Sequence, residues 1–171
     1  TAFLISVYFQ DERGMAASTA GVLLLIANVG MPIAGALVNA VRHLATPPTL
    51  MITALVGLAG AYLLLGVGTQ WPIPALLLPL IAIGVGAGAL YSVDTSTMLN
   101  IVDGPQAAPA MATLALMRQI GSVLGITTLA SAGEIAVSAS LVERGEPVAF
   151  LLAASVLVVL AVSLRQRLPR T

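Results

Sequence analysis

The sequence predicts an all-α, polytopic membrane protein with five full transmembrane helices and the end of a sixth. Hydrophobic residues make up 58% of the 171 residues and charged residues only 8%, against about 25% charged in an average soluble domain. The clearest apolar run, 107–132, contains Arg118 as its single charge. A helix of that length rises roughly 39 Å, enough to cross the hydrocarbon of a bilayer with some tilt. We therefore expect the lipid bilayer to surround most of the chain.

The composition also argues against several functional classes. Net charge is zero, the seven basic residues are all arginine, and no basic cluster suggests a nucleic-acid partner. Without cysteine, and with His43 as the single histidine, thiolate and multi-histidine metal sites are excluded. The sequence has no HExxH, GxSxG, P-loop or dinucleotide-binding motif. We therefore expect no enzyme activity, no metal and no cofactor.

The chain opens with a short apolar run, 1–9, followed by a longer one at 17–41. The first is too short to cross a bilayer, so we expect it to be the end of a span in a larger protein. The second is interrupted by Asn28, Gly30 and Pro32. A proline inside a membrane helix kinks it and frees a backbone carbonyl. The interruption serves either helix packing or ligand binding, with packing the more common case.

Two further spans are expected at 49–68 and 75–101. On the second, small and polar residues recur at three- and four-residue spacing along one side: Gly84, Gly88, Tyr91, Thr95 and Met98. Asp94 borders that side. The spacing of Gly84 and Gly88 is typical of close helix packing in membranes.

The last two spans are expected at 107–132 and 148–164. Within the first, Gly121 and Gly125 again predict a close helix contact. Arg118 lies in the same span, and an arginine in hydrocarbon costs at least a few kcal/mol. We therefore expect Arg118 to face a bundle interior, a water-filled cavity or a counter-charge.

Asp94 and Arg118 are expected at similar depths. Asp94 lies seven residues and Arg118 about 11 residues from the inner ends of their antiparallel spans, roughly 10 and 16 Å at 1.5 Å per residue. One interpretation is that Asp94 exchanges protons or binds a cation, while Arg118 adjusts its proton affinity or holds an anionic group. The other is a structural ion pair, or two side chains that snorkel toward the membrane surface.

Orientation follows from the arginines. The loop at 42–48 and the C-terminal tail lie on one side of the predicted topology and contain four of the seven: Arg42, Arg165, Arg167 and Arg170. The opposite side has two arginines amid five acidic residues. Because arginine excess marks the cytoplasmic side, we expect the C-terminus in the cytoplasm.

Several motifs carry a family resemblance. Residues 117–121 (MRQIG) with 124–126 (LGI) resemble a recurrent RQ-hydrophobic-G-x-x-L-G helix, and 84–88 (GVGAG) resembles a glycine-rich helix. Residues 8–10 (YFQ), followed by the stretch 14–22 (GMAASTAGV), resemble a YLQ turn and the helix entry after it. These motifs are similar to those in the C-terminal half of a major facilitator superfamily transporter, most of all in the 14-span multidrug:proton antiporter branch.

The cytoplasmic loop motif of that family, G-x-L-A-D-R-x-G-R, has a degenerate counterpart at 35–43 (GALVNAVRH). It keeps Gly35, has Asn39 in place of the acidic residue, and carries its positive charge at Arg42. Asn39 and Ala40 therefore lack the two charges that the family motif has at these positions.

The resemblance implies that residues 1–171 form the C-terminal transmembrane half of a transporter in the bacterial cytoplasmic (inner) membrane. The missing N-terminal half would be its partner, and amphipathic small molecules would be exported in exchange for protons. Candidate residues for one wall of the cavity between the halves are Asn28, Tyr91, Asp94 and Thr95. Alternatives are a non-transporting membrane domain that anchors a complex and, less favoured, a membrane-embedded enzyme.

Overall fold

A computed structural model of the chain describes residues 6, 9–10, 14–68, 71–138 and 146–167. The described residues form helices and their connections, with no strand, so the all-α prediction is confirmed. The long helices are α2 (Ala17–Val41), α3 (Pro47–Val67), α4 (Ile73–Ile101), α5 (Gly104–Ser138) and α6 (Glu146–Arg167).

Among the described residues, four helices are long and apolar enough to cross a membrane: α2, α3, α4 and the Gly104–Ser131 part of α5. In α6 the apolar helical segment within the described residues is Phe150–Gln166, which is shorter. Four of the five predicted full spans therefore have a helix of sufficient length and hydropathy. The fifth, predicted at 148–164, stays a prediction. Most of the partial span expected at 1–9 lies outside the described residues.

The helix boundaries follow the chemistry of their first turns. The α3 helix begins at Pro47, two residues before the predicted start, because proline is favoured in a first turn, where its missing N–H has no helical partner. The α5 helix is longer than the predicted 107–132 at both ends. Its early start at Gly104 leaves only Val102 and Asp103 between α4 and α5.

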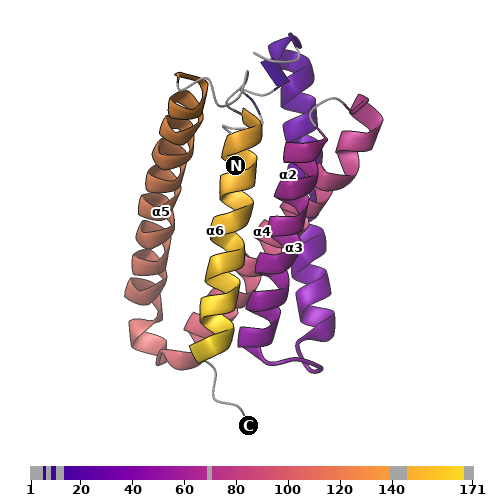
Figure 1. Cartoon of the computed structure of the whole chain (residues 1–171). Coiled ribbons are helices and arrows are strands. Elements are labelled where there is room, and N and C mark those ends of the chain that lie inside the picture. Colours follow the sequence, from indigo (N-terminus) through magenta and orange to yellow (C-terminus); the bar gives the residue numbers. More distant parts are fainter. Residues whose placement is uncertain (1–5, 7–8, 11–13, 69–70, 139–145, 168–171) are drawn as a thin grey trace.

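The ends of the helices fall where the predicted topology requires. The α2–α3 connection, the α4–α5 connection and the C-terminal end of α6 lie at one end of the bundle, the lower end in Figure 1. Arg42 and Arg165 are therefore at the same end of the molecule. The assignment of that end to the cytoplasm stays a prediction.

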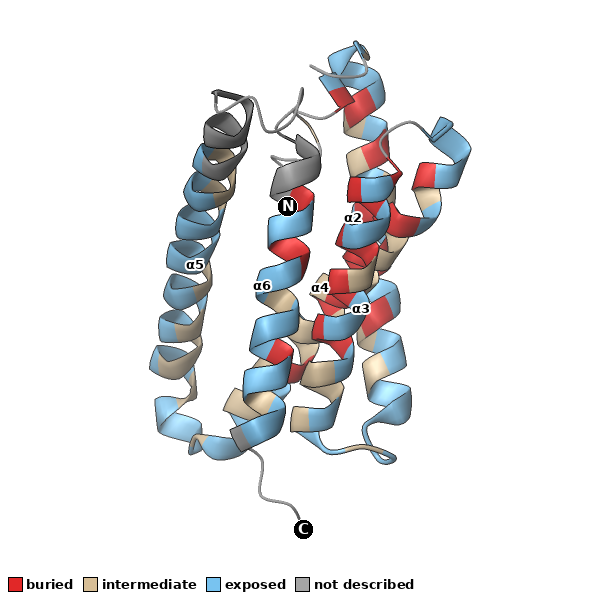
Figure 2. Ribbon diagram, in the orientation of Figure 1, coloured by how far each residue is buried: buried red, intermediate tan, exposed pale blue. Residues whose placement is uncertain are grey.

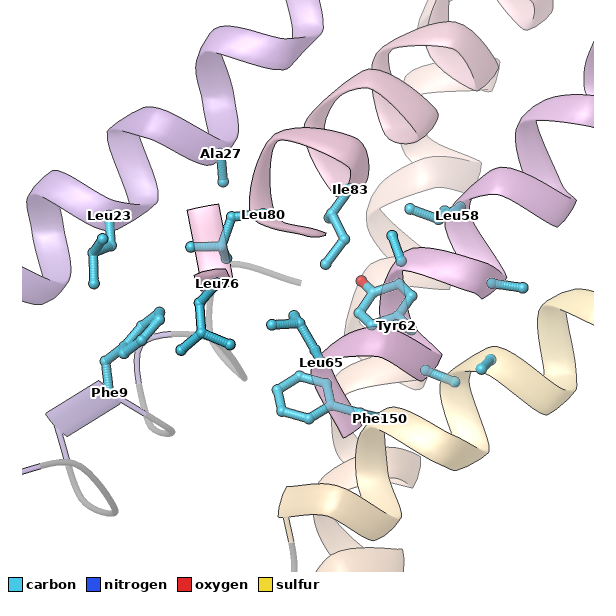
Figure 3. Close-up of a cluster of buried hydrophobic side chains, with 14 of the residues drawn as sticks. Phe9, Leu23, Ala27, Leu58, Tyr62, Leu65, Leu76, Leu80, Ile83 and Phe150 are labelled. Carbon is cyan, nitrogen blue, oxygen red and sulfur yellow. The ribbon is translucent and has the colours of Figure 1, made fainter. Parts of the chain in front are cut away.

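The apolar core lies around α3, where α4 and α6 pack on it. Its largest fully buried side chains include Leu65 from α3, Leu76 and Leu80 from α4, and Phe150 from α6 (Figure 3). Phe150 stacks on Tyr62 with ring centroids 6.2 Å apart. By contrast, no residue in the apolar segment of α5 is buried (Figure 2).

The α2 and α4 helices cross so closely that their backbones touch. A Cβ atom added to Gly84 would overlap the carbonyl oxygen of Ala27, and one added to Gly88 would lie 2.7 Å from the Cα of Met31. From the α2 side, a Cβ on Gly30 would lie 2.6 Å from a backbone nitrogen of α4. Only glycine allows this separation, because any side chain would meet rigid backbone and not a flexible side-chain end.

The second glycine pair, Gly121 and Gly125, does not make the close helix contact that its spacing predicts with any described residue. At Gly121 and Gly125 an added Cβ would find no heavy atom of the described residues within 4 Å. The close contact expected there is therefore not made with any helix in the described part of the chain. The reason is that the two glycines lie on an exposed side of α5, beside exposed side chains such as Leu124.

Candidate functional site

Arg118, midway along α5, reaches across to α4. Its Nη2 atom donates hydrogen bonds to Thr95 Oγ1 at 3.1 Å and to the backbone oxygen of Tyr91 at 3.3 Å. Its guanidinium carbon also lies 4.0 Å from the centroid of the Tyr91 ring. Tyr91 and Thr95 are four residues apart, so they lie one above the other on the same side of α4. The two residues together hold the guanidinium by hydrogen bonds and by a cation–π contact.

Asp94 completes the cluster but is attached more loosely. Its Oδ2 atom lies 3.8 Å from Arg118 Nη2, which is within range of an ion pair but too long for a hydrogen bond. The Asp94 side chain is 33% exposed and that of Arg118 25%. The arginine is thus fixed by Thr95 and Tyr91, while the carboxylate keeps oxygen lone pairs for a proton, a cation or water.

The cluster explains how α5 accommodates an arginine. Around Arg118, the side chains of Leu116, Met117 and Ile120 are more than half exposed and apolar, as suits a helix that faces lipid or a further protein surface. An ionised group in such a segment needs a polar partner. Arg118 finds three such partners on one helix, so it also serves as a polar link between α5 and α4.

Four of the five residues that the sequence singled out for a substrate or proton pathway thus lie together: Tyr91, Asp94, Thr95 and Arg118. Asn28 does not join them. Its amide donates to the carbonyl of Leu24 on its own helix at 2.8 Å. The neighbouring Ala27 meets α4 at Gly84, ten residues before Asp94 and therefore about 15 Å away along the helix.

The loop-motif residues lie at a different place. Gly35, Asn39 and Arg42 line a pocket of about 310 Å³ between the end of α2, the α2–α3 connection and α4. Pro32 lies about one turn before this pocket, within a helix that continues through it to Val41. The degenerate loop motif therefore forms one wall of a pocket that is separate from the charged cluster.

The opposite wall of that pocket comes from three polar residues of α4 that the sequence pattern did not single out. Ser92, Ser96 and Asn100 line it. They recur every four residues, the spacing that places side chains on one side of a helix. The signal was therefore present, but it was less prominent than the charge of Asp94 on the same helix.

Comparisons with known proteins found one similar curated protein. No family model matches the chain, and no solved structure matches it. Over 129 residues, or 74% of this chain, the sequence is 31% identical to the multidrug efflux pump LfrA of Mycolicibacterium smegmatis. The matched part makes up 25% of LfrA, so the chain spans about a quarter of the length of this relative.

The similarity and the apolar helices together indicate an integral membrane protein that resembles a transporter and not a classical enzyme. The aligned length is great enough to include several of the helices described above.

Proposed function

We propose that this chain is the C-terminal transmembrane part of a major facilitator superfamily exporter that couples the efflux of amphipathic compounds to proton entry. The observation that carries the proposal is the cluster of Arg118 with Tyr91, Asp94 and Thr95, set between two apolar helices. The similarity to a multidrug efflux pump supports the same class of activity. In this proposal the 14-span proton antiporters are the nearest branch.

Proton coupling needs a group whose protonation changes the balance between two conformations. Asp94 fits this role because its carboxylate faces Arg118 at 3.8 Å without a hydrogen bond. A proton on Asp94 removes the attraction between them, whereas the bonds from Arg118 to Thr95 and Tyr91 do not depend on it. Protonation therefore weakens, but does not abolish, the link between α4 and α5.

The same groups can recognise a cationic, amphipathic cargo. The Tyr91 side chain is 56% exposed, and its ring face and the Asp94 carboxylate are the two groups that attract the guanidinium of Arg118. An aromatic face and a carboxylate bind organic cations by the same forces. A proton, the arginine and a cationic cargo are then alternative partners for Asp94, and this competition is the basis of exchange.

The rest of the pathway follows from the class of transporter. An N-terminal half outside this chain supplies the opposite wall of the cavity, and the two halves alternate between inward- and outward-facing states around it. The end of the bundle that contains Arg42 and Arg165 faces the cytoplasm of a bacterial cell. In this proposal Asn28 lines the same cavity nearer the start of α2, about 15 Å from the charged cluster along the bundle.

The test uses the full-length protein that contains this chain, reconstituted into liposomes with an imposed pH gradient. Asp94→Asn should lower gradient-driven export of a fluorescent organic cation at least about fivefold, the lower end of typical coupling free energies. Asp103→Asn is the matched control, because Asp103 is exposed in the connection between α4 and α5. Unchanged export by Asp94→Asn would remove Asp94 from the mechanism, and the absence of any export by the parent protein would favour a membrane anchor.

A further inference from the structure

The pocket at the end of α2 is lined by side chains of two kinds. Polar groups come from both helices: Asn39, Arg42, Ser92, Ser96 and Asn100. Aliphatic side chains complete the lining, among them Val38 and Leu50. With a volume of about 310 Å³, the pocket is at the lower limit of the sites that bind small organic molecules.

The pocket has a positive charge and unused hydrogen-bond donors. Arg42 is its one charged lining residue, and no acidic side chain lines it. Within the described part of the chain, the side chains of Asn39, Arg42, Ser92 and Asn100 make no hydrogen bond or ion pair. Such a set of free donors around a guanidinium is complementary to an anion with several oxygen atoms.

The pocket also lies at a defined level of the bundle. Arg42 directly follows the last residue of α2, and Asn100 is the penultimate residue of α4. Both helices are apolar enough to cross a membrane, so their ends lie where the hydrocarbon gives way to lipid headgroups. Val38 lies one turn further into the span than Arg42. Arg42 and Asn100 are therefore at the headgroup level, while Val38 and Ser92 lie deeper in the span.

We propose that this pocket binds the phosphate group of an anionic phospholipid. Arg42 pairs with the phosphate, the amides of Asn39 and Asn100 donate hydrogen bonds to its oxygens, and Val38 contacts the upper part of an acyl chain. A free phosphate ion would leave the aliphatic side of the pocket unfilled, which favours the lipid. This inference depends on the membrane location of the chain and not on the efflux activity proposed above.

The first test measures lipid retention. The full-length protein, purified in detergent and equilibrated with phosphatidylglycerol, is analysed by native mass spectrometry. Arg42→Gln should lower retention about tenfold, the loss expected for one charge-assisted hydrogen bond, and Arg42→Lys should restore part of it. Arg165→Gln is the matched control, because it removes the same charge at the same end of the bundle but outside the pocket lining. Equal losses for Arg42→Gln and Arg165→Gln would overturn the proposal in favour of diffuse surface attraction.

A second test changes the shape of the pocket without changing its charge. A Cβ on Gly35 would lie 3.6 Å from Ser92 Oγ, an ordinary contact, so Gly35→Ala should fold normally. Gly35→Leu should fill the pocket and lower phosphatidylglycerol retention, while Gly35→Ala lowers it less. Retention by Gly35→Leu equal to that of the parent protein would contradict the site, provided that its thermal stability is also unchanged. If Gly35→Leu is unstable, the result for Arg42 decides.

The ligand class is decided by competition. Phosphatidylglycerol should be retained more strongly than phosphatidylcholine, and millimolar inorganic phosphate should not displace it. Displacement by inorganic phosphate would identify a site for free anions, and equal retention of phosphatidylcholine would show that the negative charge is not recognised. Either result would overturn the assignment to an anionic phospholipid. Neither result bears on export, because the measurement is made without transport.

Discussion

The α4 helix contacts α2 and α5 in opposite ways. It meets α2 at Gly84 and Gly88, where the two backbones touch. It meets α5 through the side chain of Arg118, while the apolar segment of α5 has no buried residue. Closely packed backbones have few alternative arrangements, whereas a long side chain can keep its contacts over a range of positions. The contact between α2 and α4 therefore tolerates less change than the contact between α4 and α5.

The largest effect is expected from a single methyl group at the α2–α4 crossing. Gly84→Ala should lower the free energy of unfolding by about 1–3 kcal/mol or more, because the Cβ must displace the backbone of α2 at Ala27. Thermal unfolding of the purified full-length protein measures this. Gly57→Ala on α3 is the control, since no heavy atom lies within 4 Å of its Cβ position. Equal stability of the two variants would show that the two backbones do not touch at this crossing.

The next largest effect is a loss of export when Arg118 can no longer bond to α4. Arg118→Leu should lower gradient-driven export about tenfold or more through loss of the bonds to Thr95 and Tyr91. Arg118→Lys should recover only part of it, because lysine keeps the charge but lacks the planar group that stacks and donates in two directions. Export assays at matched protein levels make the measurement. Normal export by Arg118→Leu would show that the arginine only snorkels.

A smaller effect on export is expected from the Tyr91 ring, whose contact with Arg118 can be tested separately from the hydrogen bond to the Tyr91 backbone. Tyr91→Leu removes the aromatic face 4.0 Å from the guanidinium carbon and should lower export about threefold, within the range for one cation–π contact. Tyr91→Phe should leave export unchanged, because Arg118 bonds the backbone oxygen and not the hydroxyl. A loss of export with Phe equal to that with Leu would assign the role to the hydroxyl instead.

The smallest effect is expected at the open glycines of α5. Gly121→Ala and Gly125→Ala should each change the free energy of unfolding by less than about 0.5 kcal/mol if the side of α5 that carries them faces lipid. Thermal unfolding of the full-length protein measures this too, against the Gly84→Ala result. A loss comparable to that of Gly84→Ala would mean that this side of α5 packs on a protein surface outside the described residues.

The sequence predicted the elements of this fold well because lipid acts on each helix separately. Hydropathy and helix length depend on neighbouring residues along the chain, so α2 runs over the expected 17–41 and the other helices begin or end within a few residues of their predicted bounds. The same reasoning showed that Arg118 needs a polar partner. Residue spacing alone also placed Tyr91 and Thr95 on one side of α4, because side chains four residues apart on a helix lie one above the other.

Other features depended on which sides of the helices face one another. Local sequence could not show that Asn28 lies apart from the cluster, that Gly125 is open while Gly84 is in contact with backbone, or that Ser92 shares a pocket with Arg42. Each of these relations joins residues from different helices, and the rotation of one helix against another is set by the packing of all of them together. The sequence by itself determined a set of membrane helices and the residues that need partners, and only the tertiary structure decided which partners they have.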